Sequence, residues 1–330
     1  MGQLLSEPIV DKTSEKGCDE CRLIYGTSSM QGWRISMEDA HTAVLDLKRE
    51  DGKSAPDDKV SFFAVYDGHG GSKAAIFAGQ NLHNIVARQA AFEKGDYEQA
   101  LKDGFLSTDR AILQVDVNFG NDPSGCTATT ALLTDSKIFV ANAGDSRTVL
   151  GVKGHAKPLS YDHKPQNEGE KARIVAAGGF IDAGRVNGNL ALSRAIGDFD
   201  FKKSPDLPPE EQVVTAFPDV MEHDFSEDDE FVVLACDGIW DCLTSQQVVE
   251  FVRRGIAEKQ ELQLICENLM DNCLASSSDG VGIGCDNMTV TIVGLLNGKT
   301  TEEWYDLIAT RVANGDGAVG DKELGAYISA

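Results

Sequence analysis

The chain has 330 residues, of which 42% are hydrophobic and 25% are charged. This composition excludes a disordered chain and allows a sizeable core in one large domain or two ordinary ones. The 53 acidic residues outnumber the 30 basic ones, and the net charge of -23 repels phosphate backbones, so we expect no binding to nucleic acid.

The first 21 residues are polar and carry no regular hydrophobic pattern, which predicts an N-terminal tail over residues 1–21. Gly2, with Ser6 behind it, fits the pattern for N-myristoylation, which would give only weak, reversible membrane contact. There is no apolar run of about 18 residues and no hydrophobic signal sequence, so we expect an intracellular, soluble protein. The eight cysteines suggest no disulfide framework, and we expect them to be reduced.

Between residues 23 and 296, short β-branched and aromatic runs outnumber helical blocks. Two helices are expected early, over residues 72–92 and 97–115. Strands are expected over residues 126–133, 137–143 and 147–152, which follow one another with no helix between them. Such strands pair antiparallel, so we predict an α+β fold: a β-sandwich of two antiparallel sheets packed face to face and flanked by α-helices.

Two capping boxes mark later helices. Thr244 and Gln247 open an apolar-periodic stretch that ends near residue 256, and residues 262–274 repeat the pattern. Thr300 and Glu303 open a last helix that is expected to end near residue 314. A glycine-rich end follows.

Residues 162–189 begin with a His163-Lys164-Pro165 segment and then combine a short helical stretch with adjacent glycines. This mixture predicts a surface excursion from the sheets. We therefore expect three parts in the chain: a tail over residues 1–21, a catalytic domain over 22–296 and a helical extension over 297–330.

Four aspartates stand where an apolar β-type run begins or ends: Asp67, Asp145, Asp237 and Asp286. A buried strand has no use for a carboxylate at its tip, whereas a hard divalent cation needs several carboxylates held around one point. Any one of these segments taken alone is more often a simple turn. Four of them together predict a metal site, which Glu38-Asp39 could complete.

The chemistry of this set favours Mg²⁺ or Mn²⁺ over zinc, because carboxylate oxygens are hard donors and no cluster of His or Cys accompanies them. Such a site could hold two cations and a bridging water that attacks phosphorus in line. No cysteine is followed by an arginine at the Cys-x5-Arg spacing of thiolate phosphatases, and the segment beginning at Asp198 does not match an aspartyl-nucleophile motif. We therefore expect a metal-activated water instead of a protein nucleophile.

Two further residues suit phosphate chemistry. The guanidinium of Arg34 matches two phosphate oxygens, and His69, two residues after Asp67, could protonate a leaving alkoxide. Taken alone, an arginine beside a tryptophan is more often a surface residue, and a histidine in a glycine turn is more often structural. The neighbouring aspartate supports the case for His69.

These residues belong to a series of motifs that resembles the type 2C metal-dependent serine/threonine protein phosphatases, over about residues 23–296 and in that family's order. The sequence of the N-terminus and of residues 236–246 is most similar to that of fungal members that dampen stress-activated MAP kinases and checkpoint kinases. The motifs are Met30-Gln31-Gly32-Trp33-Arg34, Met37-Glu38-Asp39-Ala40-His41, Val65-Tyr66-Asp67-Gly68-His69-Gly70-Gly71, Ser124-Gly125-Cys126-Thr127-Ala128, Asn142-Ala143-Gly144-Asp145-Ser146-Arg147, Asp162-His163-Lys164-Pro165, Arg185-Val186-Asn187-Gly188, Ser193-Arg194-Ala195-Ile196-Gly197-Asp198, Ala235-Cys236-Asp237-Gly238-Ile239-Trp240-Asp241 and Asp286-Asn287-Met288.

The resemblance implies a site with two Mg²⁺ or Mn²⁺ ions and a third, weaker ion. It implies that Arg34 holds the substrate phosphate and that His69 is the general acid. It also implies that residues 162–189 form the family's flap beside the site. The implied metal ligands are Asp67 as a bridge between both ions, the Gly68 carbonyl at one ion, Asp237 and Asp286 at the other, Glu38 through water, and Asp145 together with Asp237 at the third ion, with Thr127 nearby.

The expected activity is hydrolysis of phosphoserine and phosphothreonine in stress or cell-cycle kinase signalling, by a monomer in the cytoplasm and nucleus. The expected partners are phosphoproteins, among them MAP kinases or checkpoint kinases. One alternative is a pseudophosphatase that binds phosphoproteins without turnover; it predicts a missing metal aspartate, and none is missing. Another is a structural module whose Asp-Gly turns are only turns. After Leu296 no family motif is found.

Overall fold

The computed structural model describes residues 4–48, 59–115, 119, 122–278 and 282–320. The predicted myristoylation site at Gly2 and the last ten residues lie outside this range. The chain divides into two compact units. Unit 1 comprises Met1–Met37, Thr148–Leu159 and Asp224–Ala330, and unit 2 comprises Glu38–Arg147 and Ser160–His223.

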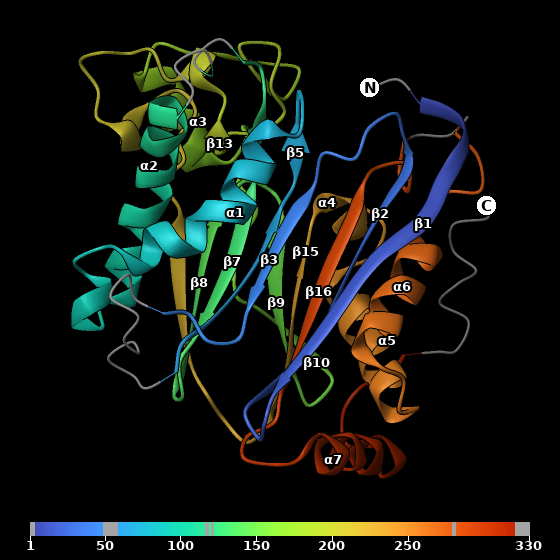
Figure 1. Cartoon of the computed structure of the whole chain (residues 1–330). Coiled ribbons are helices and arrows are strands. Elements are labelled where there is room, and N and C mark those ends of the chain that lie inside the picture. Colours follow the sequence, from blue (N-terminus) through green and yellow to red (C-terminus); the bar gives the residue numbers. More distant parts are fainter. Residues whose placement is uncertain (1–3, 49–58, 116–118, 120–121, 279–281, 321–330) are drawn as a thin grey trace. The chain divides into compact units, whose positions relative to one another are not determined.

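Unit 1 is built on a six-stranded sheet in the order β1-β2-β16-β15-β9-β10. Four of its five strand pairs, β1 with β2, β2 with β16, β16 with β15 and β9 with β10, are antiparallel. Figure 1 shows α6 lying along the sheet beside β1 and β2, whereas α5 contacts β10 at the opposite edge of the sheet. The strands are β1 (Leu4–Asp19), β2 (Leu23–Arg34), β9 (Arg147–Val152), β10 (His155–Pro158), β15 (Asp229–Ala235) and β16 (Met288–Leu295).

The helices of unit 1 are α4 (Asp237–Trp240), α5 (Ser245–Ala257), α6 (Leu262–Cys273) and α7 (Thr301–Ala313). Both predicted capping boxes are present: the N–H of Gln247 donates to the Thr244 hydroxyl, and that of Glu303 donates to Thr300. The amphipathic faces of these helices pack with β15 and β16 into one hydrophobic core. The predictions for the later helices are thus confirmed to within a residue or two.

Unit 2 is built on a five-stranded sheet in the order β14-β8-β7-β4-β3, in which β3 with β4, β4 with β7 and β7 with β8 pair antiparallel. A short three-stranded sheet, β13-β6-β5, and a hairpin, β11-β12, complete it. The strands are β3 (Ala40–Val44), β4 (Ser61–Tyr66), β5 (Gly68–His69), β6 (Gly125–Cys126), β7 (Ala128–Leu133), β8 (Lys137–Ala143), β11 (Ile181–Asp182), β12 (Arg185–Val186), β13 (Ile196–Gly197) and β14 (Asp219–Asp224).

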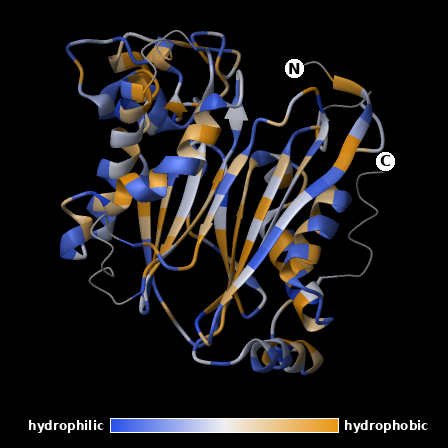
Figure 2. Cartoon of the chain, viewed as in Figure 1, coloured by the Kyte–Doolittle hydropathy of each residue, from blue (hydrophilic) through white to orange (hydrophobic). Residues whose placement is uncertain are grey.

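The helices of unit 2 are α1 (Lys73–Ala87), α2 (Tyr97–Val115) and α3 (Glu168–Ala176). Alanines on α1 and aromatic residues on α2 are buried against β4 and β8 in one core, and Figure 2 shows hydrophobic residues along the strands of the sheet. Short 3₁₀ turns are η1 (Phe92–Lys94), η3 (Phe199–Phe201) and η4 (Pro209–Glu211). The excursion expected over residues 162–189 contains α3 and the β11-β12 hairpin, which have a small core of their own.

The predicted tail over residues 1–21 is wrong for residues 4–19, which form β1. This strand lies at the edge of the sheet, so it buries little and keeps its polar sequence. Backbone pairing with β2 and ion pairs from Lys12 to Asp271 (2.7 Å) and Lys16 to Glu261 (2.9 Å) hold it in place. Because backbone pairing and ion pairs hold β1 in place, its sequence shows no hydrophobic pattern from which the strand could be predicted.

The α+β fold class is confirmed: antiparallel sheets are flanked by helices in both units. In the described part of the chain, no helix has the length and apolar content to cross a bilayer.

Candidate functional site

Asp67 directly follows the fully buried strand β4. Its backbone N–H donates to the Thr127 hydroxyl (3.3 Å), and the Thr127 N–H donates to the Asp67 carbonyl (2.9 Å). The Thr127 and Ser146 hydroxyls are also hydrogen-bonded, at 2.6 Å. The strand end that carries the Asp67 carboxylate is therefore tied to the turn after β8, which carries Asp145.

Gly68 lies against the loop that carries Glu38. A Cβ atom at position 68 would stand 2.1 Å from the Glu38 carbonyl oxygen, so only glycine fits there. The Gly71 N–H donates to the Glu38 side chain (3.3 Å), and carboxylate oxygens of Asp39 and Asp67 lie within 4.8 Å of each other. Two carboxylates this close repel each other unless a proton or a cation lies between them.

His69 is paired with Asp198: its Nε2 lies 2.7 Å from Asp198 Oδ2. Asp198 is buried and has a left-handed backbone, with φ at 50°. Burial lowers the pKa of His69, but the hydrogen bond and charge of Asp198, helped by the charges of Asp145 and Glu38, outweigh this effect and raise the pKa above its ordinary value. The imidazole is therefore biased toward its protonated form, the form that a general acid needs.

Asp145 is 4% exposed and its Oδ2 is ion-paired with the Lys164 ammonium. Burial raises the pKa of the Asp145 carboxyl, although the charge of Lys164 opposes this shift. Among the described residues, its Oδ1 finds no hydrogen-bond partner outside Asp145 itself. A buried carboxylate oxygen in this state suits a cation.

In unit 1, Asp237 begins the four-residue helix α4 directly after β15. The Trp240 indole N–H donates to the Ala235 carbonyl (2.7 Å) and fixes this short helix on the strand. A Cβ atom at Gly238 would stand 2.2 Å from the Asn287 carbonyl oxygen. The segments that carry Asp237 and Asp286 are thus in close contact.

Arg34 ends β2 and donates from Nη2 to Asp286 Oδ2 at 2.5 Å. The other carboxylate oxygen of Asp286 accepts the Asn287 N–H (2.8 Å). The Asn287 amide donates to the carbonyls of Gln31 (2.8 Å) and Ser36 (3.0 Å) and so fastens the two segments together. Within unit 1, Arg34 therefore lies beside Asp286, a candidate metal ligand.

The predicted site residues fall into two groups. Glu38, Asp67, Gly68, His69 and Asp145 gather in unit 2, and Arg34, Asp237 and Asp286 gather in unit 1.

Sequence reasoning assigned no role to Asp198 as the partner of His69, or to Lys164 as the partner of Asp145. Both lie in motifs of the family series, but their contacts join residues 129 and 19 positions apart. Such pairings carry no local signal.

Residues 24–281 match the family described as Protein phosphatase 2C. The chain belongs to the protein phosphatase 2C family. It is similar to Protein phosphatase 2C homolog 2 of Aspergillus fumigatus, with 68% identity over 95% of this chain and 74% of that protein. The protein of the same name in Schizosaccharomyces pombe is 61% identical over 96% of this chain and 85% of its own length.

Solved structures show the same fold. The crystal structure of a Toxoplasma gondii phosphatase matches with a TM-score of 0.69 and 26% identity, over 87% of this chain and 96% of that one. A serine-threonine phosphatase 2C from the same organism also reaches 0.69, at 21% identity over 88% of this chain and 98% of that one. The predicted family and its fungal character are confirmed. The chain is a protein serine/threonine phosphatase of the 2C family, which uses Mg²⁺ or Mn²⁺.

The residues present fit such a cation. Within unit 2, the neighbouring carboxylates of Asp39 and Asp67 are hard oxygen donors of the kind that Mg²⁺ and Mn²⁺ prefer. Asp145 adds a buried oxygen that has no outside partner among the described residues, and the lack of a side chain at Gly68 lets the Glu38 backbone approach closely.

Proposed function

We propose that this phosphatase hydrolyses phosphoserine and phosphothreonine with a water molecule activated at a dinuclear Mg²⁺ or Mn²⁺ site. The proposed metal ligands are Glu38, Asp67, the Gly68 carbonyl, Asp237 and Asp286, and Asp145 serves a third, weaker ion. The observation that carries the proposal is the closeness of the Asp67 carboxylate to that of Asp39, the chain neighbour of the proposed ligand Glu38. Asp67 directly follows β4, whose residues are apolar or aromatic apart from Ser61. Two cations bound there would lower the pKa of a water molecule and so make hydroxide available to attack phosphorus near neutral pH.

The protein's own residues divide the remaining work. Arg34 binds two phosphate oxygens with its guanidinium fork, and the bond to Asp286 orients that fork before substrate arrives. His69 donates a proton to the leaving serine or threonine oxygen. Asp198 supports this role because it orients the imidazole and raises its pKa.

The substrate class that we propose is phosphoproteins of stress or cell-cycle kinase signalling, among them MAP kinases or checkpoint kinases. We further propose a monomer that acts in the cytoplasm and nucleus, with Gly2 carrying myristate. The intact mass of the protein isolated from a eukaryotic host tests the last point: an increase by one myristoyl group supports it, and an unmodified N-terminus contradicts it.

Phosphate release from a phosphoserine or phosphothreonine peptide tests the chemistry. We expect activity at millimolar Mg²⁺ or Mn²⁺, loss of activity in excess chelator, and full activity after treatment with thiol-alkylating inhibitors. Turnover that survives chelation would exclude the metal-activated water. Inactivation by alkylation that metal ions do not prevent would point to a cysteine nucleophile instead.

A further inference from the structure

The Asp162-His163-Lys164 segment has no part in the chemistry above, yet each of its side chains contacts the turn over residues 144–147 after β8. We propose that this segment delivers Lys164 as a tethered cation, which occupies the Asp145 carboxylate when no metal ion is bound there and competes with the ion that binds. The proposal rests on the role of Asp145 as a metal ligand given above.

His163 clasps the backbone of the turn. The backbone N–H of His163 donates to the Gly144 carbonyl (2.9 Å), and the backbone N–H of Gly144 donates to the ring Nδ1 of His163 (3.2 Å). Beside it, Arg147 and Asp162 form two hydrogen bonds of 2.8 Å. These contacts fix the backbone on both sides of His163, so the position of the next residue, Lys164, is fixed as well.

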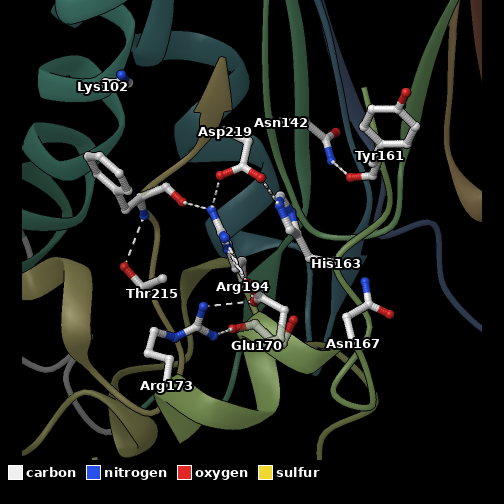
Figure 3. Close-up of polar contacts among 12 residues, drawn as sticks. Lys102, Asn142, Tyr161, His163, Asn167, Glu170, Arg173, Arg194, Thr215 and Asp219 are labelled. Carbon is white, nitrogen blue, oxygen red and sulfur yellow. Dashed lines mark hydrogen bonds and ion pairs between the residues drawn. The ribbon is translucent and has the colours of Figure 1, made fainter. Parts of the chain in front are cut away.

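A charged network holds His163 from its other side (Figure 3). His163 Nε2 lies 3.0 Å from Asp219, whose other oxygen accepts from Arg194 Nη1 at 2.7 Å. Arg194 also binds Glu170 on α3 (2.7 Å), and Arg173 binds the same carboxylate (2.8 Å). Since His163 and Glu170 are both buried, this network anchors the clasp in the core of the excursion that contains α3.

Lys164 reaches from this clasp to Asp145 Oδ2. The other oxygen of Asp145 has no outside partner among the described residues, and the side chain is buried. A carboxylate in this position needs a cation, because burial penalises an unpaired charge. Lys164 supplies that cation within the chain at Oδ2. Because its positive charge lies beside the same carboxylate, the ammonium group repels a metal ion that binds Oδ1 and weakens its binding.

Two opposite effects follow for Lys164→Met, which keeps an unbranched side chain but removes the charge. Without metal, the variant leaves Asp145 buried and unpaired, so its thermal midpoint in chelator should fall by about 2–4 °C. With metal, the competitor is gone, so Mg²⁺ should bind its weakest site about tenfold more tightly in a calorimetric titration. A structural lysine would produce the first effect and not the second.

The matched control is Lys171→Met, which removes an exposed lysine from α3 in the same excursion. Lys171→Met should leave both the chelator midpoint and the Mg²⁺ affinity unchanged, which separates the proposed contact from a general loss of positive charge. An unchanged or weaker Mg²⁺ affinity in Lys164→Met would overturn the proposal, as would an equal gain in both variants.

A double variant covers the case in which Lys164→Met does not fold. Asp145→Asn removes the charge that needs a cation. The double variant Asp145→Asn/Lys164→Met should therefore fold, and in chelator its thermal midpoint should equal that of Asp145→Asn. A double variant that fails to fold would show that Lys164 is needed for packing and would overturn the proposal.

Phosphopeptide turnover of the unmodified chain is measured alongside. If Mg²⁺ does not stimulate it, the proposed function fails. If Mg²⁺ does and Lys164→Met binds metal normally, only the present inference fails.

Discussion

Arg34 and Asp286 form an ion pair in which both side chains are partly exposed, so the arginine is accessible and already oriented. Arg34→Ala removes the proposed phosphate fork, and we expect the KM for a phosphopeptide to rise about tenfold or more with a smaller change in kcat. Steady-state kinetics at saturating Mg²⁺ provides the measurement.

Arg34→Lys is the control for charge, because it keeps the cation and loses the fork. Its KM should lie between those of the unmodified chain and Arg34→Ala. If Arg34→Ala keeps the normal KM, Arg34 does not bind the phosphate.

Glu170 gives a second prediction at the scale of one residue. Although burial raises the pKa of this carboxyl, the hydrogen bond and charge of Arg194, together with Arg173, lower it to about 2. The folded pKa lies below the unfolded value of about 4.3, so the stabilisation is present above about pH 4.3 and is lost as the pH falls toward 2.

Glu170→Gln should therefore lower the free energy of unfolding by about 2–3 kcal/mol near pH 7, and the deficit should shrink below about pH 4.3. Urea denaturation of both proteins at several pH values measures it. A deficit that stays constant down to pH 3 would mean that the loss comes from packing and not from the carboxylate charge.

At the scale of elements, α5 and α7 meet at a buried ion pair. Arg253 on α5 binds Glu230 at 2.8 Å, with side chains 0% and 1% exposed, and Arg311 on α7 binds the same carboxylate at 3.1 Å. Arg253 also donates to the carbonyls of Asp316 (2.6 Å) and Ala318 (3.1 Å). The segment after Leu296, which matches no family motif, is therefore part of the core of unit 1.

Arg253→Met should lower the free energy of unfolding by about 3 kcal/mol or more, because it leaves part of a buried carboxylate and two carbonyls without their donor. Arg254→Met, one position further on the same helix, is the control and should cost much less. Comparable losses in the two variants, measured by urea denaturation, would contradict the role given to Arg253.

The elements differ in how far the sequence could predict them. The helices α5 and α7 have local signals, namely a capping box and an apolar stripe, and both were predicted. Strand β1 was missed because its stability comes from backbone pairing and from ion pairs with α6, which depend on distant residues. The same reason applies at the site: Asp67 stands out beside its strand, whereas the pairing of His69 with Asp198 depends on the fold.

At the scale of the whole molecule, the net charge of -23 makes a protein without bound cations repel itself wherever its carboxylates gather. Neutralising one such carboxylate should therefore spare the fold, even where it harms the chemistry. This contrast separates a catalytic carboxylate from a structural one.

Asp67→Asn is the most direct test, because it keeps the shape of the residue proposed to bridge both cations and removes its charge. We predict that phosphopeptide turnover falls by about 100-fold or more and that Mg²⁺ affinity falls with it, while the thermal midpoint in chelator stays the same or rises. Asp206→Asn, at an exposed position, should match the unmodified chain in all three. An Asp67→Asn variant that unfolds would make Asp67 structural, and one that folds with normal turnover and metal dependence would contradict the dinuclear mechanism.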